Sequence, residues 1–238
     1  MPRQCVVVCA FALLVLASAP APAAPIEYGD YFGANPGDIS FLQVAENSTT
    51  DPTPLFNAPI HLPNQLIFIP TVFASGSANG SADTTSGTLT MRIQADTGFF
   101  LELITIKEVG DYTLSGVGTP ATSATVNGLL TLTDINPGKH GIMTDLLSVN
   151  PAPIYSLPVD SSGEFDAITQ INLTGLAISE VVLNFNNNLQ TTSEQGTTSF
   201  IQKKVQIVIT PEPNSLSLLI LGALMVRGRR RRRNPTSS

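Results

Sequence analysis

Alternation of apolar and polar side chains constrains the fold of this chain more than any other feature. In the clearest segment, residues 88–95, one face carries Leu89, Met91, Ile93 and Ala95, and the other carries polar side chains. Successive side chains of a β-strand point to opposite sides, so a period of two predicts strands that bury one face. Between residues 24 and 213, no long segment shows the period of an amphipathic helix.

The same alternation, interrupted by runs rich in Gly, Asn, Pro, Asp and Ser, predicts eight strands. They cover residues 39–46, 66–73, 88–95, 99–109, 126–133, 166–174, 179–185 and 200–210. Pro70 confines the second strand to a sheet edge or a bulge, because proline has no amide hydrogen to donate. In the fourth, the apolar phase shifts from Leu101 and Leu103 to Ile104 and Ile106, which predicts a bulge near Leu103.

Turn-forming residues predict the loops between these strands. The loops cover residues 75–87, 116–122, 136–138 and 160–163, and the prolines of residues 47–64 predict an irregular excursion over the surface. Short antiparallel strands with one wet face each bury their apolar faces best as two packed sheets. The sequence therefore predicts an all-β fold, a single β-sandwich of jelly-roll-like or immunoglobulin-like class, over residues 24–210.

Residues 1–23 have the composition of a secretory signal peptide, which would form a signal helix. Arg3 supplies the positive end, residues 6–16 supply the apolar core, and Ala21 and Ala23 supply the small side chains that signal peptidase reads. A cut that places proline first is disfavoured, so we expect cleavage between Ala23 and Ala24. An uncleaved anchor is the alternative.

The part that follows is acidic and has no cysteine. Both cysteines, Cys5 and Cys9, lie in the signal segment, so we expect no disulfide and no thiolate site downstream. All 18 acidic residues but only five of the 12 basic residues lie between residues 24 and 213, which leaves a net charge near −13 there. Such a domain does not bind nucleic acid through a basic face, so we expect no nucleic-acid partner.

Three distinct segments follow the strand predicted at residues 200–210. The first is Pro211, Glu212 and Pro213, which we expect to end that strand at Thr210 because proline cannot donate to the ladder. The second, residues 214–226, predicts a short hydrophobic helix with the apolar side chains Leu216, Leu218, Leu219, Ile220, Leu221, Leu224, Met225 and Val226. The third, residues 227–233, is a basic cluster of Arg227, Arg229, Arg230, Arg231, Arg232 and Arg233, and a polar tail follows at 234–238.

The hydrophobic segment is short for a membrane anchor. As a helix, residues 216–226 extend about 16 Å, against a hydrocarbon core of about 30 Å, so the segment inserts only as a marginal span. Basic residues stay on the cytoplasmic side of a membrane. The arginine cluster therefore predicts that the preceding domain lies outside.

This ordered series of motif, short helix and basic cluster resembles the PEP-CTERM protein-sorting signal. In that family an exosortase, a membrane-embedded cysteine protease-transpeptidase, recognises the tail and cuts near the motif. The resemblance implies an exported bacterial protein that is held transiently in the inner membrane and then sorted to the cell surface or extracellular matrix. The preceding domain is also similar to those of planctomycete PEP-CTERM proteins, in segments such as 44–52 and 108–116.

Residues suited to catalysis are sparse and match no catalytic motif. His61 lies in a proline-rich loop and His140 in a glycine-flanked turn, and no HExxH, GxSxG or P-loop pattern occurs in the sequence. Glycoside hydrolysis needs two carboxyl groups close together. The acids that could supply them, with none preferred, are Glu102, Glu108, Asp111, Glu164 and Glu180. We therefore expect a protein that is not an enzyme and needs no cofactor.

Two weaker signals concern ligands. Asp134 and Asn136 place oxygen atoms at alternating positions, as at the start of a calcium loop, but the later ligands are missing, so a turn without metal is favoured. The alternative to a non-enzymatic surface protein is a carbohydrate-binding module, with extracellular polysaccharide as its partner. That alternative requires exposed aromatic side chains on one face. The candidates are Tyr28, Tyr31, Phe32, Tyr112 and Tyr155.

Overall fold

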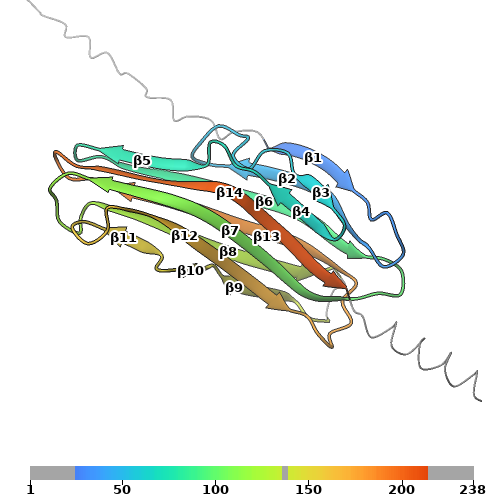
Figure 1. Cartoon of the computed structure of the whole chain (residues 1–238). Coiled ribbons are helices and arrows are strands. Elements are labelled where there is room, and N and C mark those ends of the chain that lie inside the picture. The colour runs from blue at the N-terminus through green and yellow to red at the C-terminus, as the bar shows by residue number, and fades with distance from the viewer. Residues whose placement is uncertain (1–24, 136–138, 214–238) are drawn as a thin grey trace, which may run out of the picture.

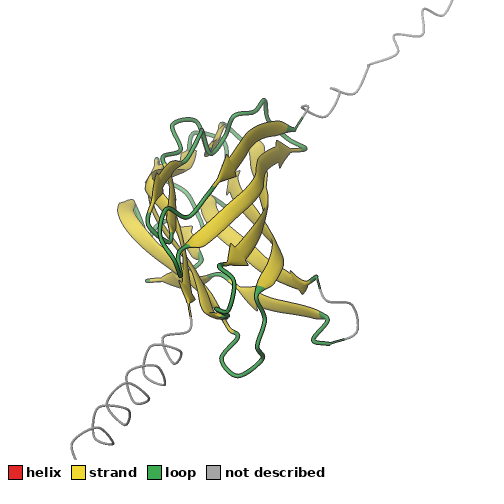
Figure 2. Ribbon diagram, turned by 90° about the vertical axis from the view of Figure 1, so that its right-hand side faces the viewer, coloured by secondary structure: helices red, strands yellow, loops and turns green. Residues whose placement is uncertain are grey.

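The computed structural model describes residues 25–135 and 139–213, with the backbone alone for 204–213. Every regular element in these ranges is a β-strand. The strands form two seven-stranded sheets that pack face to face (Figures 1 and 2), which confirms the predicted all-β sandwich. Within the described ranges, no helix has the length and apolar character needed to cross a membrane.

The first sheet has the strand order β1–β2–β6–β13–β8–β11, and β9 also pairs with β8. The strands are β1 (Ile26–Tyr31), β2 (Ile39–Ser48), β6 (Ala82–Ala95), β8 (Ser123–Asp134), β9 (Ile142–Leu146), β11 (Ile154–Ser156) and β13 (Glu180–Thr192). At its centre, β13 pairs antiparallel with β6 on one side and with β8 on the other along its whole length.

The second sheet has the order β10–β12–β7–β14–β4–β3, and β5 also pairs with β14. The strands are β3 (Ile60–Leu62), β4 (Gln65–Phe68), β5 (Ala74–Ala78), β7 (Leu101–Ser115), β10 (Ser148–Asn150), β12 (Ser162–Asn172) and β14 (Thr198–Pro213). Figure 1 shows β14 beside β7, the two running in opposite directions.

The facing sides of the two sheets form one apolar core. The positions that the alternation predicted to face inward are buried, with Leu89 and Ile93 of β6 and Leu183 and Phe185 of β13 fully inaccessible to solvent. Side chains of β14, β7 and β12 cover them from the opposite sheet, among them Ile201. Burial of these faces is the main source of stability in a fold of this kind.

The phase shift predicted near Leu103 is confirmed. Pro213 pairs with Leu101 while Glu212 pairs with Leu103, so Glu102 is an extra residue on β7 at this point. Such a bulge turns the following side chains to the other face. Beyond it, Ile104 is fully buried between the sheets.

Two predictions in the region of residues 66–87 are wrong. The strand expected at 66–73 ends at Phe68, before Pro70, and the expected loop at 75–87 instead holds β5 and the first part of β6. Two inward hydroxyl groups of these polar strands find partners: Ser75 Oγ lies 3.0 Å from Thr191 Oγ1, and Thr85 Oγ1 donates a hydrogen bond of 2.7 Å to the Ala74 carbonyl. Satisfied hydrogen bonds allow polar side chains to occupy inward positions, which the apolar pattern does not reveal.

The excursion at residues 47–64 is irregular between β2 and β3, as predicted, but it does not merely cross the surface. Leu55 and Phe56 are buried in the core. The buried carboxylate of Glu46 fixes this segment, because it accepts hydrogen bonds from the amides of Leu55 (2.6 Å) and Phe56 (2.9 Å). The hydroxyl of Tyr28 donates a third hydrogen bond, of 2.8 Å, to the same carboxylate, and burial, together with this partner, raises the pKa of Tyr28.

We predict that Glu46→Ala destabilises the fold by about 2–4 kcal/mol, because it leaves buried donors without an acceptor. Urea denaturation of the chain measures the change in the free energy of unfolding. Glu27→Ala, at an exposed position of β1, is the matched control and should change this free energy by less than about 0.5 kcal/mol. Equal stability of the two variants would contradict the role assigned to Glu46.

Candidate functional site

The Pro-Glu-Pro motif is the last part of β14 and not a separate linker. The predicted end of the strand at Thr210 is wrong, because β14 continues to Pro213. Pro211 pairs with Ile104 of β7, and Glu212 with Leu103. The motif is therefore held by backbone pairing at one end of the second sheet.

The pairing pattern explains why prolines are compatible with this strand. On its other side, β14 pairs with β4 only over residues 207–209. Past Ile209, no strand in the described part of the chain pairs with that side of β14, so the motif occupies an edge. Proline is tolerated at sheet edges because an amide that faces away from the ladder donates no hydrogen bond there.

The remaining predicted parts of the sorting signal lie outside the described residues. These are the hydrophobic helix at 214–226 and the arginine cluster at 227–233. The proposed cleavage residues Ala21 and Ala23 also lie outside them. For all of these, the sequence-based predictions stand as predictions.

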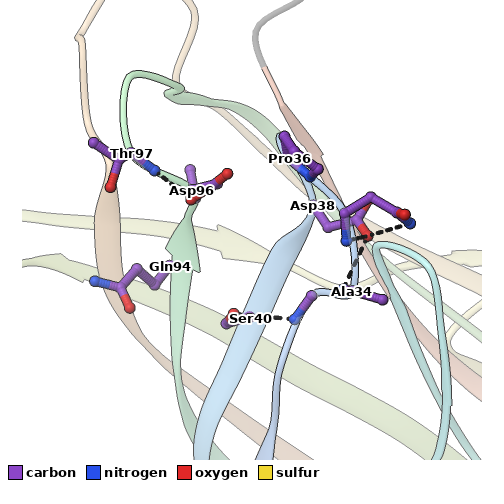
Figure 3. Close-up of a pocket in the computed structure, with 10 residues that line it drawn as sticks. Ala34, Pro36, Asp38, Ser40, Gln94, Asp96 and Thr97 are labelled. Carbon is purple, nitrogen blue, oxygen red and sulfur yellow. Dashed lines mark hydrogen bonds between the residues drawn. The ribbon is translucent and has the colours of Figure 1, made fainter.

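A pocket of about 340 Å³ opens between the loop that joins β1 to β2 and the end of β6. Figure 3 shows Ala34, Pro36 and Asp38 on one side and Asp96 and Thr97 on the other. The remaining lining residues are Gly33, Asn35, Ser40, Gln94 and Ala95. Apart from Ala34, Pro36 and Ala95, the walls are polar.

Both carboxylates of this pocket are engaged by backbone amides. Asp96 accepts hydrogen bonds from the amides of Gly37 (3.0 Å) and Thr97 (2.7 Å), which lower the pKa of its carboxyl group. Asp38 accepts bonds from the amides of Ala34 (3.1 Å) and Asn35 (2.7 Å). Gly37 has a φ of 90°, which favours glycine. The two carboxylates thus hold a tight loop in place through these hydrogen bonds. A structural role of this kind explains the positions of both side chains.

The acids considered for catalysis occupy different environments. Glu164 on β12 lies directly opposite Asp111 on β7, on the outer face of the second sheet. Glu180 pairs with Arg92 of β6, and Glu108 is buried between the sheets. Glu102, the fifth candidate, is the extra residue of the β7 bulge.

The two histidines and the weak calcium candidate also do not form a common site. His61 lies on β3 against the rings of Tyr31 and Phe41, with ring centroids 5.6 and 6.1 Å away. His140 Nδ1 lies 3.0 Å from Asp134 Oδ2, while Asn136 is outside the described residues. Across residues 25–135 and 139–213, no three His, Cys, Asp or Glu side chains gather as a metal ion would require.

The aromatic residues proposed for sugar binding do not form an exposed row. Tyr112 and Tyr155 are buried and stack on each other in the core, with ring centroids 3.7 Å apart. Tyr28 and Tyr31 are partly buried and pack against the core. Phe32 is 65% exposed, so among the five candidates it alone presents its ring to solvent.

Sequence reasoning missed the pocket and a polar cluster inside the sandwich. The pocket had a visible signal, since Asn35, Pro36 and Gly37 are turn-forming residues next to an acid. The interior cluster consists of Lys203, Glu108 and Asn187, all of which are buried. A signal was present in the sequence: these three polar residues stand at positions where the period-two pattern predicts buried side chains.

Comparisons with known proteins define no family for this chain. No protein-family model matches it, and no curated protein matches it. Among solved structures, it aligns with the family 11 xylanase from Neocallimastix patriciarum at 10% identity and a TM-score of 0.17, over 79% of this chain and 100% of that one. A loop-swap mutant of the xylanase Xyn11A aligns at 9% identity and the same TM-score and coverage.

We predict that Asp96→Ala frees the Gly37 amide and raises its rate of hydrogen exchange, measured by NMR. In the unmodified chain, the chemical shift of this amide should titrate with a midpoint below 3.8, the ordinary value for the Asp96 carboxyl group. Because its pKa is lowered by folding, the carboxylate stabilises the loop above about pH 4, and this contribution is lost as the pH falls through the lowered pKa.

Asp83→Ala is the matched control, because Asp83 accepts a similar bond of 2.8 Å from the amide of Gly76. It should leave exchange at Gly37 unchanged. Equal exchange at Gly37 in both variants would contradict the bracing role of Asp96.

Proposed function

We propose that this chain is an exported bacterial surface or extracellular-matrix protein without enzymatic activity. In this proposal, the sandwich is the exported part, and residues 211–233 are a PEP-CTERM sorting signal that an exosortase processes. The observation that carries the proposal is the position of the motif. Pro211–Pro213 ends a strand at the edge of the second sheet, and the predicted hydrophobic helix follows it directly in the sequence.

The charge distribution supports the proposed orientation. Only five of the 12 basic residues accompany the 18 acidic ones between residues 24 and 213, whereas residues 227–233 hold six arginines. An arginine cluster is held at the cytoplasmic face of a membrane. The acidic sandwich is repelled by an anionic lipid surface, so the two parts favour opposite environments.

The pocket and the aromatic residues also support a non-enzymatic role. The carboxylates of the pocket already accept bonds from backbone amides. Four of the five aromatic side chains proposed for sugar stacking are buried or partly buried, so no observation favours the carbohydrate-binding alternative. As part of this proposal, the sandwich is jelly-roll-like or immunoglobulin-like and is flanked by a signal helix and a short hydrophobic helix.

The strand pairing constrains how the signal would be processed. An exosortase that binds Pro211–Pro213 as an extended peptide needs this segment released from Leu101, Leu103 and Ile104 of β7. The bulge at Glu102 interrupts the ladder at this point and weakens it locally. A cut beyond Pro213 would leave the sandwich with its last strand complete.

We predict that replacing Pro211, Glu212 and Pro213 together by alanine leaves the protein unprocessed in the inner membrane of an exosortase-containing host. Fractionation and intact-mass measurement should find the variant there with residues 214–238 still attached, whereas the unmodified chain is released without its tail.

The matched control replaces residues 234–236, which include a proline outside the three-part signal, by alanine, and should be released normally. Deletion of the host exosortase should hold the unmodified chain in the membrane. Release of the Pro211–Pro213 variant at the processed mass would contradict the proposal.

A further inference from the structure

Three polar side chains from both sheets meet in the core. Lys203 of β14 and Glu108 of β7 belong to the second sheet, and Asn187 of β13 belongs to the first. Lys203 Nζ donates a hydrogen bond to Glu108 Oε2, and Asn187 Nδ2 donates one to Glu108 Oε1. Their relative exposures are 3%, 1% and 0%, respectively. A single carboxyl group therefore brings an amine and a carboxamide together out of contact with solvent.

Glycines flank this cluster within both sheets. Asn187 lies in register between Gly87 of β6 and Gly128 of β8, and Lys203 lies in register with Gly110 of β7. Apolar side chains, most of them aromatic rings, occupy the space that these glycines leave. A Cβ atom at Gly87 would lie 2.7 Å from the ring of Phe73.

The same phenylalanine ring contacts the lysine. Lys203 Nζ lies 5.7 Å from the ring centroid of Phe73, and the Lys203 amide donates a hydrogen bond of 3.0 Å to the Phe73 carbonyl. Phe73 therefore lies next to the Lys203 amine and next to Gly87, the residue that pairs with Asn187. This arrangement fixes the reactive groups in one apolar compartment.

Burial changes the chemistry of the Lys203 amine. Desolvation lowers the pKa of Lys203, against the opposing attraction of the Glu108 carboxylate. An apolar site disfavours the ammonium form of Lys203 and favours the neutral amine. A desolvated lysine amine is a nucleophile, and a carboxyl group in contact with both the amine and the carboxamide can carry a proton between them.

We propose that Lys203 and Asn187 form a covalent amide bond between their side chains, with Glu108 as the proton-transferring group. The nucleophile is Lys203 Nζ and the electrophile is Asn187 Cγ. Because both side chains are held on one carboxyl group, the reaction gains from proximity in the way that intramolecular reactions do. This inference concerns the sandwich itself and does not depend on the proposed sorting function.

The reaction is balanced without an oxidant or a cofactor. Neutral Nζ attacks Cγ and forms the new C–N bond, and Glu108 transfers a proton from Nζ to the departing nitrogen. The Cγ–Nδ2 bond breaks and ammonia leaves. Asn187 Oδ1, which is buried without a hydrogen-bond partner before the reaction, becomes the carbonyl oxygen of the new amide.

The product would join the two sheets covalently in a part of the chain that has no cysteine. The new bond closes a loop between β13 and β14, neighbouring strands in sequence that lie in opposite sheets. Cross-links of this kind restrict the unfolded chain. The product also replaces a buried ionisable amine by an uncharged amide, which has no charged form to desolvate.

Peptide mapping of the full chain after storage at neutral pH tests the proposal. A glutamate-specific protease cuts after Glu180 and Glu194, which separates residues 181–194, with Asn187, from a fragment that begins at Gln195 and contains Lys203. We expect these two fragments joined, at a mass lower than their sum by one ammonia molecule, with fragmentation spectra that locate the link at Asn187 and Lys203.

The variants Lys203→Met, Asn187→Ala and Glu108→Gln should each lack the joined fragment. Asn186→Ala, at the exposed neighbouring position of β13, is the matched control and should retain it. Two separate fragments in the unmodified chain would overturn the proposal, and so would loss of ammonia confined to residues 181–194, which indicates a succinimide. The result for the unmodified chain decides the question even if a variant fails to fold.

Discussion

Mutual burial of two sheet faces is the constraint on which the rest of this structure depends. Sheets with one apolar face each are stable only against one another. The central strands β13 and β14 carry much of this contact, because each pairs with strands on both sides. The loops, the pocket and the motif are all positioned by the edges and ends of these two sheets.

Two buried carboxylates inside the sandwich are held by specific partners. Glu46 holds the irregular segment between β2 and β3 through the amides of Leu55 and Phe56. Glu108 binds Lys203 within the second sheet and connects that sheet to the first through Asn187. A buried charge without such partners would cost several kcal/mol, so these contacts also specify which strands face each other.

A single strand joins the two proposals made for this protein. Strand β14 contains Lys203 in its first half and Pro211–Pro213 at its end. An amide bond at Lys203 would secure the inner part of β14, while the bulge opposite the motif leaves the outer end easier to release. A firmly held strand with a releasable end suits a domain that must stay folded while its tail is processed.

The sequence by itself determined the all-β class, the period-two faces of most strands and the bulge near Leu103, because these depend on neighbours along one strand. It could not determine the pairing order or the inward polar strand β5, since pairing depends on which distant segments meet. The pocket beside Asp96 joins residues about 60 positions apart. The alternation in the sequence placed Glu108, Asn187 and Lys203 on inward faces. Only the tertiary structure could show that these side chains meet, because they come from three strands in two sheets.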